Sequence, residues 1–272
     1  MRRPIALAAS VLLGVTMVAA PSSAPLANVV VHAPRIALRP NGNGHGHGGG
    51  GGGGGGGSSF GWASSNWSGY AVSSSTPGAF SSVSGEWTVP TVQSSSGTTY
   101  SSSWVGIDGF NNSSLIQTGT EQDYVNGRAT YYAWWEILPA AETVITAFAV
   151  SPGDSIDASI VPAGSGHWAI TITDQTRGET FHTTQAYSGP GTSAEWIEEA
   201  PTIGGHVATL AHYGEATFDP GTANGAGPNL TVTDGGVMIQ RRKQVSTPSA
   251  PDPDTDGFNV AYGSTQPAAP AS

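Results

Sequence analysis

Cysteine is absent from this chain of 272 residues, and charged side chains make up only 10% of it. The lack of cysteine excludes a disulfide scaffold, a thiolate metal site and a cysteine nucleophile. Helix-favouring residues do not dominate the composition, which argues against a coiled coil or a helix bundle. The 9 Lys and Arg stand against 19 Asp and Glu, and this balance argues against binding to nucleic-acid phosphates.

The few charges are unevenly distributed along the chain. Residues 1–59 contain four arginines and no acid, whereas residues 60–272 contain all 19 acids and only five bases. Most carboxylates of the second part therefore have no basic partner, and their mutual repulsion at neutral pH fades as they protonate near pH ~4. This pattern favours a protein that works in acid; a generic acidic exoprotein is the alternative.

The first 27 residues have the pattern of an export signal. Met1-Arg-Arg-Pro is basic, Ile5 to Ala20 is apolar, and small residues follow as far as Ala27, where we place the cleavage. The apolar run of roughly 16 residues is short for a membrane span, which argues against an uncleaved anchor. We therefore expect a secreted, extracellular protein that has no membrane attachment after cleavage.

Residues 28–59 are interpreted as a pro-segment and a glycine-rich linker. They contain Arg35, Arg39 and the glycine run Gly48–Gly57, which cannot repay the entropy of ordering. His45 and His47 precede this run, but two histidines in a glycine coil make a poor metal site. The basic segment is expected to dock on the acidic domain and inhibit it at neutral pH. Release is expected when carboxylates and histidines titrate.

Residues 60–263 alternate apolar or aromatic residues with small polar ones, and Gly, Pro, Asn and Asp interrupt the alternation. This period of two predicts β-strands. The strands are expected at residues 66–73, 81–88, 99–108, 115–118, 127–137, 144–151, 155–160, 167–174, 179–186, 194–198, 206–218, 230–233, 237–240 and 258–262. Many short strands predict a single all-β sandwich domain. Residues 246–257 are expected to form a loop, and residues 264–272 a disordered tail.

Familiar hydrolase motifs are missing from the domain. Its four histidines, at positions 167, 182, 206 and 212, belong to no Gly-x-Ser-x-Gly elbow and to no His-Glu-x-x-His or His-x-His zinc pattern. Carboxylates set among aromatic residues are what remains as candidate chemistry.

Two segments combine carboxylates with aromatic residues. In residues 131–136, a strand places Tyr132, Trp134 and Glu136 on one face; this is either a substrate groove or a buried structural strand. In residues 192–199, a strand places Glu195 and Glu199 on one face. Crowding and apolar neighbours would raise their pKa values, as a general acid or base needs. The alternative for this segment is a solvated edge strand.

Gln117 lies within a third candidate segment, Leu115-Ile-Gln-Thr-Gly119. Its amide would either hydrogen-bond the backbone or donate to an oxyanion, and the sequence by itself favours the structural role.

Six motifs together resemble the eqolisin family of glutamic peptidases. They are Asn66–Val72, Trp87–Pro90, Trp104–Gly109, Leu115–Gly119, Tyr132–Glu136 and Ser193–Ile197, in this order, and the match extends over about residues 65–263. The resemblance implies a concanavalin-like jelly roll, a β-sandwich of two seven-stranded antiparallel sheets. It also implies peptide-bond hydrolysis at acidic pH. Fungal members have disulfides, so their absence here indicates a bacterial-type branch.

Matched motif by motif, the resemblance implies that Gln117 and Glu195 are the catalytic pair and that neither metal nor cofactor takes part. The implied substrate-binding residues are Trp67, Trp104, Asp108, Glu121, Trp134 and Glu136. The expected protein is therefore a secreted acid endopeptidase, made as a zymogen, that acts as a monomer on polypeptides.

Two other functions fit the same residues. A jelly-roll glycoside hydrolase would also carry two glutamates among tryptophans on a concave sheet, and Glu136 and Glu195 would be its pair. A carbohydrate-binding sandwich would bind without turnover.

Overall fold

The structure of the protein is a computed structural model that describes residues 30–38 and 60–272. The expected export signal and the glycine run lie outside the described residues. Regular structure in the described part consists of β-strands and a 3₁₀ turn, η1 (Val232–Asp234). This part of the chain contains no helix that is long and apolar enough to cross a membrane.

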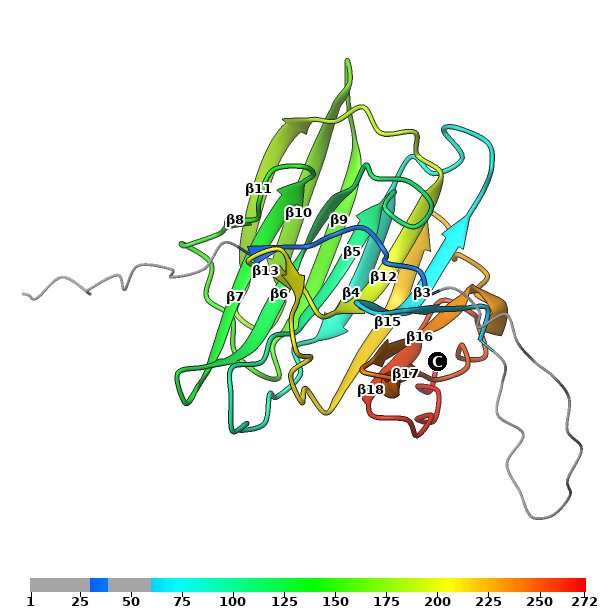
Figure 1. Cartoon of the computed structure of the whole chain (residues 1–272). Helices are drawn as coiled ribbons and strands as arrows, with labels where there is room; N and C mark the ends of the chain where they lie inside the picture. Colours follow the sequence, from blue (N-terminus) through cyan, green and yellow to red (C-terminus); the bar gives the residue numbers. More distant parts are fainter. Residues whose placement is uncertain (1–29, 39–59) are drawn as a thin grey trace, which may run out of the picture.

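The strands form two packed layers (Figure 1). The front layer has the order β16 (Gly235–Gln240), β3 (Trp67–Ser73), β12 (Ser193–Glu199), β5 (Ser102–Ile107), β6 (Ile116–Val125), β7 (Arg128–Ile137) and β8 (Thr143–Val144). The back layer has the order β11 (Glu179–Ala186), β10 (His167–Asp174), β9 (Ser155–Gly164), β4 (Val83–Thr88), β15 (Glu215–Ala223), β18 (Phe258–Tyr262) and β17 (Lys243–Pro248).

The predicted antiparallel β-sandwich is confirmed, with one difference in its connectivity. The hairpin of β16 and β17 joins the two layers, so that hydrogen bonding runs on from one layer to the other. A short strand, β2 (Trp62–Ser64), pairs in parallel with β16. A separate small sheet contains β1 (Val30–Val31), β13 (Thr202–Ile203) and β14 (His206–Val207).

Three of the strand predictions are wrong. Residues 144–151 leave β8 at once, because the Phe148 amide donates to the Ile145 carbonyl and closes a turn. Residues 206–218 divide into β14 and β15, and Gly214 at φ +80° breaks the extended chain between them. Residues 230–233 run into η1, where Asp234 accepts the Thr231 amide.

The loop prediction for residues 246–257 also needs correction. Its prolines concealed β17, which continues to Pro248 before the loop begins. The segment 264–272, expected to be disordered, is described here without helix or strand. The side-chain amide of Asn259 donates to the carbonyl of Ala268 in this segment.

The hydrophobic core lies between the two layers. Trp196 of β12 points into it, and its indole donates to the carbonyl of Ser84 on the back layer. Other large members are Trp87, Ile107, Ile156, Ile170, Phe218 and Phe258. Burial of each such side chain contributes roughly 1.5–3 kcal/mol to the stability of the fold. Packing between the inner faces thus holds the two layers together, and the outer face of the front layer remains for a functional site.

Candidate active site

The outer face of the front layer carries the predicted catalytic pair in one row. Glu195 of β12 pairs with Gly106 of β5, and Gly106 pairs with Gln117 of β6. Glu136 of β7 extends the row beyond Gln117. Paired residues of an antiparallel sheet point to the same face, so the amide and both carboxyl groups share this face. Gly106 has no side chain to fill the interval between Gln117 and Glu195.

A second row of large side chains lies beside the first. Trp104 pairs with Ile197 on one side and with Gly119 on the other, and Gly119 pairs with Trp134. Together with Trp67 and Leu115 these side chains form a buried hydrophobic cluster on this face. The predicted groove tryptophans are therefore brought together next to the predicted catalytic pair.

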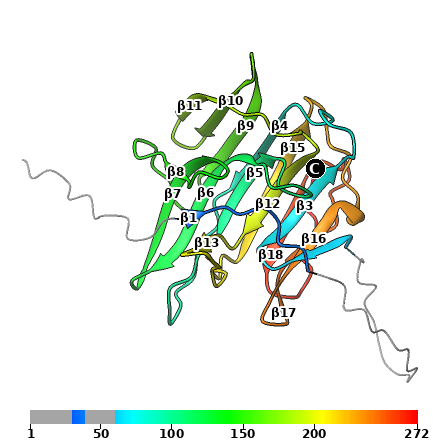
Figure 2. The same cartoon turned by 45° about the horizontal axis from the view of Figure 1, so that its top comes forward.

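Residues 30–38, which we call the strap, run across this face (Figures 1 and 2). The strap begins in β1, which pairs with β13. Further along, the Arg35 amide donates to the Gly109 carbonyl and the Leu38 amide to the Ala63 carbonyl. The indole of Trp67 donates to the Ala33 carbonyl at 3.1 Å. The strap thus closes the face on which the candidate site lies.

His32 of the strap is fully buried in a pocket of acidic residues. Its ring stacks on Trp134, with a centroid distance of 3.6 Å and an interplanar angle of 5°. Nε2 lies 3.1 Å from Glu142 and 3.2 Å from Glu121, and Nδ1 lies 3.4 Å from Glu199. Burial on its own would lower the pKa of His32, but Glu142, Glu199 and Glu136 raise it to about 10. The imidazole is therefore charged at neutral and acidic pH.

Gln117 contacts the strap directly. Its side-chain nitrogen donates to the His32 carbonyl at 3.0 Å and to Glu136 Oε2 at 2.7 Å. The His32 amide donates to the same Glu136 oxygen at 3.1 Å. The amide group of Gln117 thus already points at a peptide carbonyl of an extended segment.

Glu195 is fully buried, and among the described residues neither of its carboxyl oxygens has a hydrogen-bond partner. Burial, followed by the charge of Asp108, raises its pKa well above the usual range. Burial also raises the pKa of Glu136 to about 8, although His32 and Gln117 oppose this. Beneath the strap, Glu195 is therefore a neutral acid at acidic pH.

The interpretation of residues 192–199 as a solvated edge strand is wrong. β12 lies between β3 and β5, and Glu195, Glu198 and Glu199 are all buried. Glu199 accepts from the Trp104 indole at 2.9 Å on the outer face. Glu198 points the other way and accepts from the Ser103 hydroxyl at 2.6 Å. Hydrogen bonding and protonation, rather than contact with water, therefore allow these neighbouring glutamates to lie inside the layer.

Asp108 occupies a different position from the other predicted groove residues. Its carboxylate accepts from the Tyr187 hydroxyl at 2.6 Å and from the Gly191 and Thr192 amides at 2.9 Å. A residue with this many partners fixes the loop that leads into β12. Glu121, by contrast, faces His32.

Several residues of the site were missed by the sequence analysis. His32 and Glu142 have no surrounding motif, and they meet only because the strap crosses the sheet. Asn66 lies within a quoted motif, but its contacts with the Ala33 and Pro34 carbonyls are visible only in three dimensions. Arg35, expected to dock through its charge, donates to the Phe110 carbonyl and lies 4.0 Å above the Phe110 ring.

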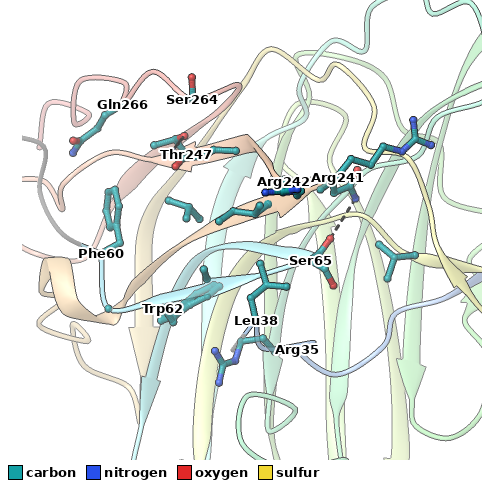
Figure 3. A pocket seen from close by; sticks show the side chains of 17 residues that line it. Arg35, Leu38, Phe60, Trp62, Ser65, Arg241, Arg242, Thr247, Ser264 and Gln266 are labelled. Carbon is teal, nitrogen blue, oxygen red and sulfur yellow. Dashed lines mark hydrogen bonds between the residues drawn. The ribbon is translucent and has the colours of Figure 1, made fainter. Parts of the chain in front are cut away.

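A large cavity lies beside the far end of the strap rather than over the predicted catalytic pair. It measures about 1420 Å³ and is lined by Trp62 of β2 and by Arg241 and Arg242 at the turn between β16 and β17 (Figure 3). Above Gln117 the space is occupied by the strap, whose His32 carbonyl accepts from the Gln117 amide. His32, Glu121 and Glu142 also have the spacing of metal ligands, but the protonated imidazole already supplies a positive charge to these carboxylates.

Fold and site together define a class of protein: a two-layer β-sandwich with an amide and buried carboxyl groups in one row beneath an extended segment. Residues 65–262 match the family model described as the Peptidase A4 family, and the chain belongs to this family of glutamic peptidases, the eqolisins. It is an enzyme that hydrolyses peptide bonds, and the family assignment decides against the glycoside hydrolase and the carbohydrate-binding sandwich.

Two curated relatives are similar to this chain. Aspergillopepsin-2 from Aspergillus niger is 29% identical over 201 residues, which cover 64% of this chain and 70% of the relative. Scytalidopepsin B from Scytalidium lignicola is 30% identical over 140 residues, which cover 50% of this chain and 51% of the relative.

Two solved structures share the fold. Scytalido-glutamic peptidase with a transition state analog inhibitor has a TM-score of 0.62 at 23% identity, over 73% of this chain and 98% of that chain. SCP-B, a member of the eqolisin family in complex with the tripeptide Ala-Ile-His, has a TM-score of 0.57 at 22% identity over the same shares.

Proposed function

We propose that this peptidase is a secreted acid endopeptidase whose catalytic pair is Gln117 and Glu195. The observation that carries the proposal is the row in which Gly106 separates the two side chains. The row lies on the face that an extended segment already occupies, with the Gln117 amide on a peptide carbonyl. The complex of the relative SCP-B with a tripeptide supports polypeptides as the substrates.

The proposed reaction is direct attack by water, without an acyl-enzyme. Ionised Glu195 takes a proton from a water molecule held above Gly106 while the water oxygen bonds to the scissile carbonyl carbon. The Gln117 amide donates to the oxyanion that forms, a contact worth about 3–4 kcal/mol. Glu195 then gives its proton to the leaving nitrogen as the C–N bond breaks. The products are a carboxylic acid and an amine, and no metal or cofactor is required by these steps.

The strap would switch off this reaction in two ways. It places the backbone of His32 where a substrate carbonyl would lie, and by closing this face it would add to the burial that raises the pKa of Glu195. When the strap leaves, water enters and the pKa of Glu195 falls towards its usual value, so that the carboxyl group ionises in mild acid. We therefore propose that residues 28–59 act as an inhibitory pro-segment.

Of the two kinds of group expected to trigger release, carboxylates and histidines, we propose that the carboxylates act and that His32 does not. Because the pKa of His32 is raised to about 10, the docked imidazole stays protonated as the pH falls from neutral to acidic. Its contribution to docking is complete below its ordinary pKa and is lost only as the pH rises through about 10. Release in acid must therefore come from protonation of the facing carboxylates, such as Glu199.

Digestion of denatured protein and of polysaccharides at pH ~3–4 tests the proposed activity. Polypeptide cleavage, with no release of sugars, is the expected result. Incubation of the purified precursor in acid, beside its Glu195→Gln variant, tests self-processing in or near residues 48–59. Equal trimming of both precursors would show that another protease makes the cut.

A further inference from the structure

A second group of carboxylates lies in the back layer, away from the front-layer row that carries the catalytic pair. The loop between β17 and β18 contains the sequence Asp252-Pro-Asp-Thr-Asp-Gly257. This spacing of three aspartates before a glycine is that of the first half of an acidic calcium loop. The second half departs from that pattern, because the chain continues into β18 and Gly263 stands where a bidentate Glu would be.

A fourth carboxylate compensates for this departure. Asp219 of β15 has a carboxyl oxygen within 4.8 Å of carboxyl oxygens of Asp252 and Asp256. A backbone hydrogen bond holds the loop against β15, because the Gly221 amide donates to the Asp256 carbonyl at 2.8 Å. Within the loop, the Asp252 amide donates to the Gly257 carbonyl at 3.0 Å. The group is therefore fixed by the fold.

Asp252 supplies the observation that points to a ligand. Its side chain is 3% exposed. Oδ1 accepts from the Asp256 amide at 3.1 Å, whereas Oδ2 has no hydrogen-bond partner among the described residues. A buried Asp256 oxygen, Oδ1, likewise has no partner in this part of the chain. Buried carboxylate oxygens without a partner are costly, and an ion or water molecule normally satisfies them.

Gly257 shows where Oδ2 of Asp252 points. A Cβ atom placed on Gly257 would lie 2.6 Å from this oxygen and 2.7 Å from the carboxyl carbon of Asp219. The oxygen therefore faces the carboxyl group of Asp219 across a gap that only a glycine leaves open.

Like charges meet in this gap without a protein cation. Among the described residues, none of the four aspartates forms an ion pair with Lys, Arg or His. A hard divalent cation with several oxygen ligands would remove this repulsion.

We propose that the chain binds one calcium ion through four aspartates: Asp219, Asp252, Asp254 and Asp256. Carboxylate oxygens from a loop and a neighbouring strand suit calcium, which accepts irregular geometry, whereas magnesium demands near-ideal octahedral geometry and retains its water. The ion would tie the β17–β18 loop to β15 and stabilise the domain. This proposal is independent of the catalytic pair.

The test uses the full chain with Glu195→Gln, which prevents self-digestion, after treatment with EGTA at pH 7. Calorimetric titration with calcium chloride should show one ion per chain. At free calcium about 100-fold above Kd, the melting temperature should rise by about 5–10 °C. No binding heat and no rise, or an equal rise with the same concentration of magnesium chloride, would contradict the proposal.

Variants locate the ion. Asp252→Asn combined with Asp256→Asn should abolish the calcium-dependent rise, whereas Glu215→Gln, an exposed change of the same charge on β15, should leave it intact. Asp254 is exposed, so the Asp254→Asn variant should fold normally. This variant should bind calcium at least several-fold more weakly. Unchanged affinity in Asp254→Asn and in the double variant would place the ion elsewhere and overturn the assignment.

Discussion

Gln117 and Glu195 stand on either side of Gly106, in one row across three neighbouring strands of the front layer. Their side chains point to the same face, because paired residues of antiparallel strands share a face. A Cβ atom on Gly106 would lie 2.8 Å from Trp104 Cζ3 and 3.2 Å from Gln117 Cβ. The glycine thus leaves the interval in which the proposed mechanism places the attacking water.

Gly106→Ala tests the importance of this interval. The added methyl group should displace Gln117 or Trp104 and reduce kcat/KM by about 100-fold or more, since small misplacements at a reacting centre are costly. The free energy of unfolding should fall by only about 1–3 kcal/mol. Gly97→Ala is the control, because a Cβ there meets no atom within 4 Å. Near-normal kcat/KM in Gly106→Ala would argue against a water molecule at this position.

Asp108→Asn should shift the pH dependence of the reaction. The charge of Asp108 helps to raise the pKa of Glu195, so removing the charge should lower that pKa. The acidic limb of the kcat/KM profile should then move to lower pH, because Glu195 must be ionised to accept a proton. Asparagine tolerates the φ of +71° at this position. A limb that moves to higher pH would contradict the role of Glu195 as the base.

His32→Ala should shorten the latency of the precursor. The change removes the stacking on Trp134 and the ion pairs with three glutamates, and loss of a buried partner costs about 3–5 kcal/mol. The lag before activity appears, measured after transfer to acid, should fall by at least tenfold. Leu38→Ala, at the exposed end of the strap, should keep the wild-type lag. A His32→Ala precursor with an unchanged lag would show that the strap does not control activity.

The domain should be more stable in acid than near neutrality. The pKa of Glu198 is raised to about 8, mainly by burial, so the folded state binds this proton more tightly than the unfolded state does. Stability then falls as the pH rises from about 4.5 to about 8. Urea unfolding of the Glu195→Gln chain should show a loss on the order of 2–5 kcal/mol across this range. Glu198→Gln should reduce the loss, whereas Glu215→Gln should not. A Glu198→Gln chain with the full pH dependence would place the proton on another group.

The fold was predictable from the sequence, and so was the set of candidate site residues that share one face of a strand. The alternation of residue types predicted bounds that match or nearly match those of β3, β10, β11 and β18, because one side of each strand faces the core. The same period placed Glu195 with Glu199, and Tyr132 with Trp134 and Glu136, on one face. The motif resemblance then selected Gln117, which composition and spacing would have left as a structural amide.

The strap contacts were not predictable from local patterns. His32 meets Glu142 across 110 positions of sequence, and no periodicity relates two such residues. The central position of β12 was also hidden, because three acids in five residues normally indicate solvent. Two of these acids are accommodated by hydrogen bonds from neighbouring strands: Ser103 and Gln122 donate to Glu198, and Trp104 donates to Glu199.

The most direct test of the account is a pH–activity profile on an unfolded protein, with the processed wild type beside Gln117→Ala and Glu195→Gln. The account predicts cleavage that peaks in acid for the wild type. Gln117→Ala should lose at least about 100-fold in kcat, and Glu195→Gln should show no turnover, while both variants unfold at wild-type urea concentrations. Full activity in either variant would contradict the assignment of Gln117 and Glu195 as the catalytic pair.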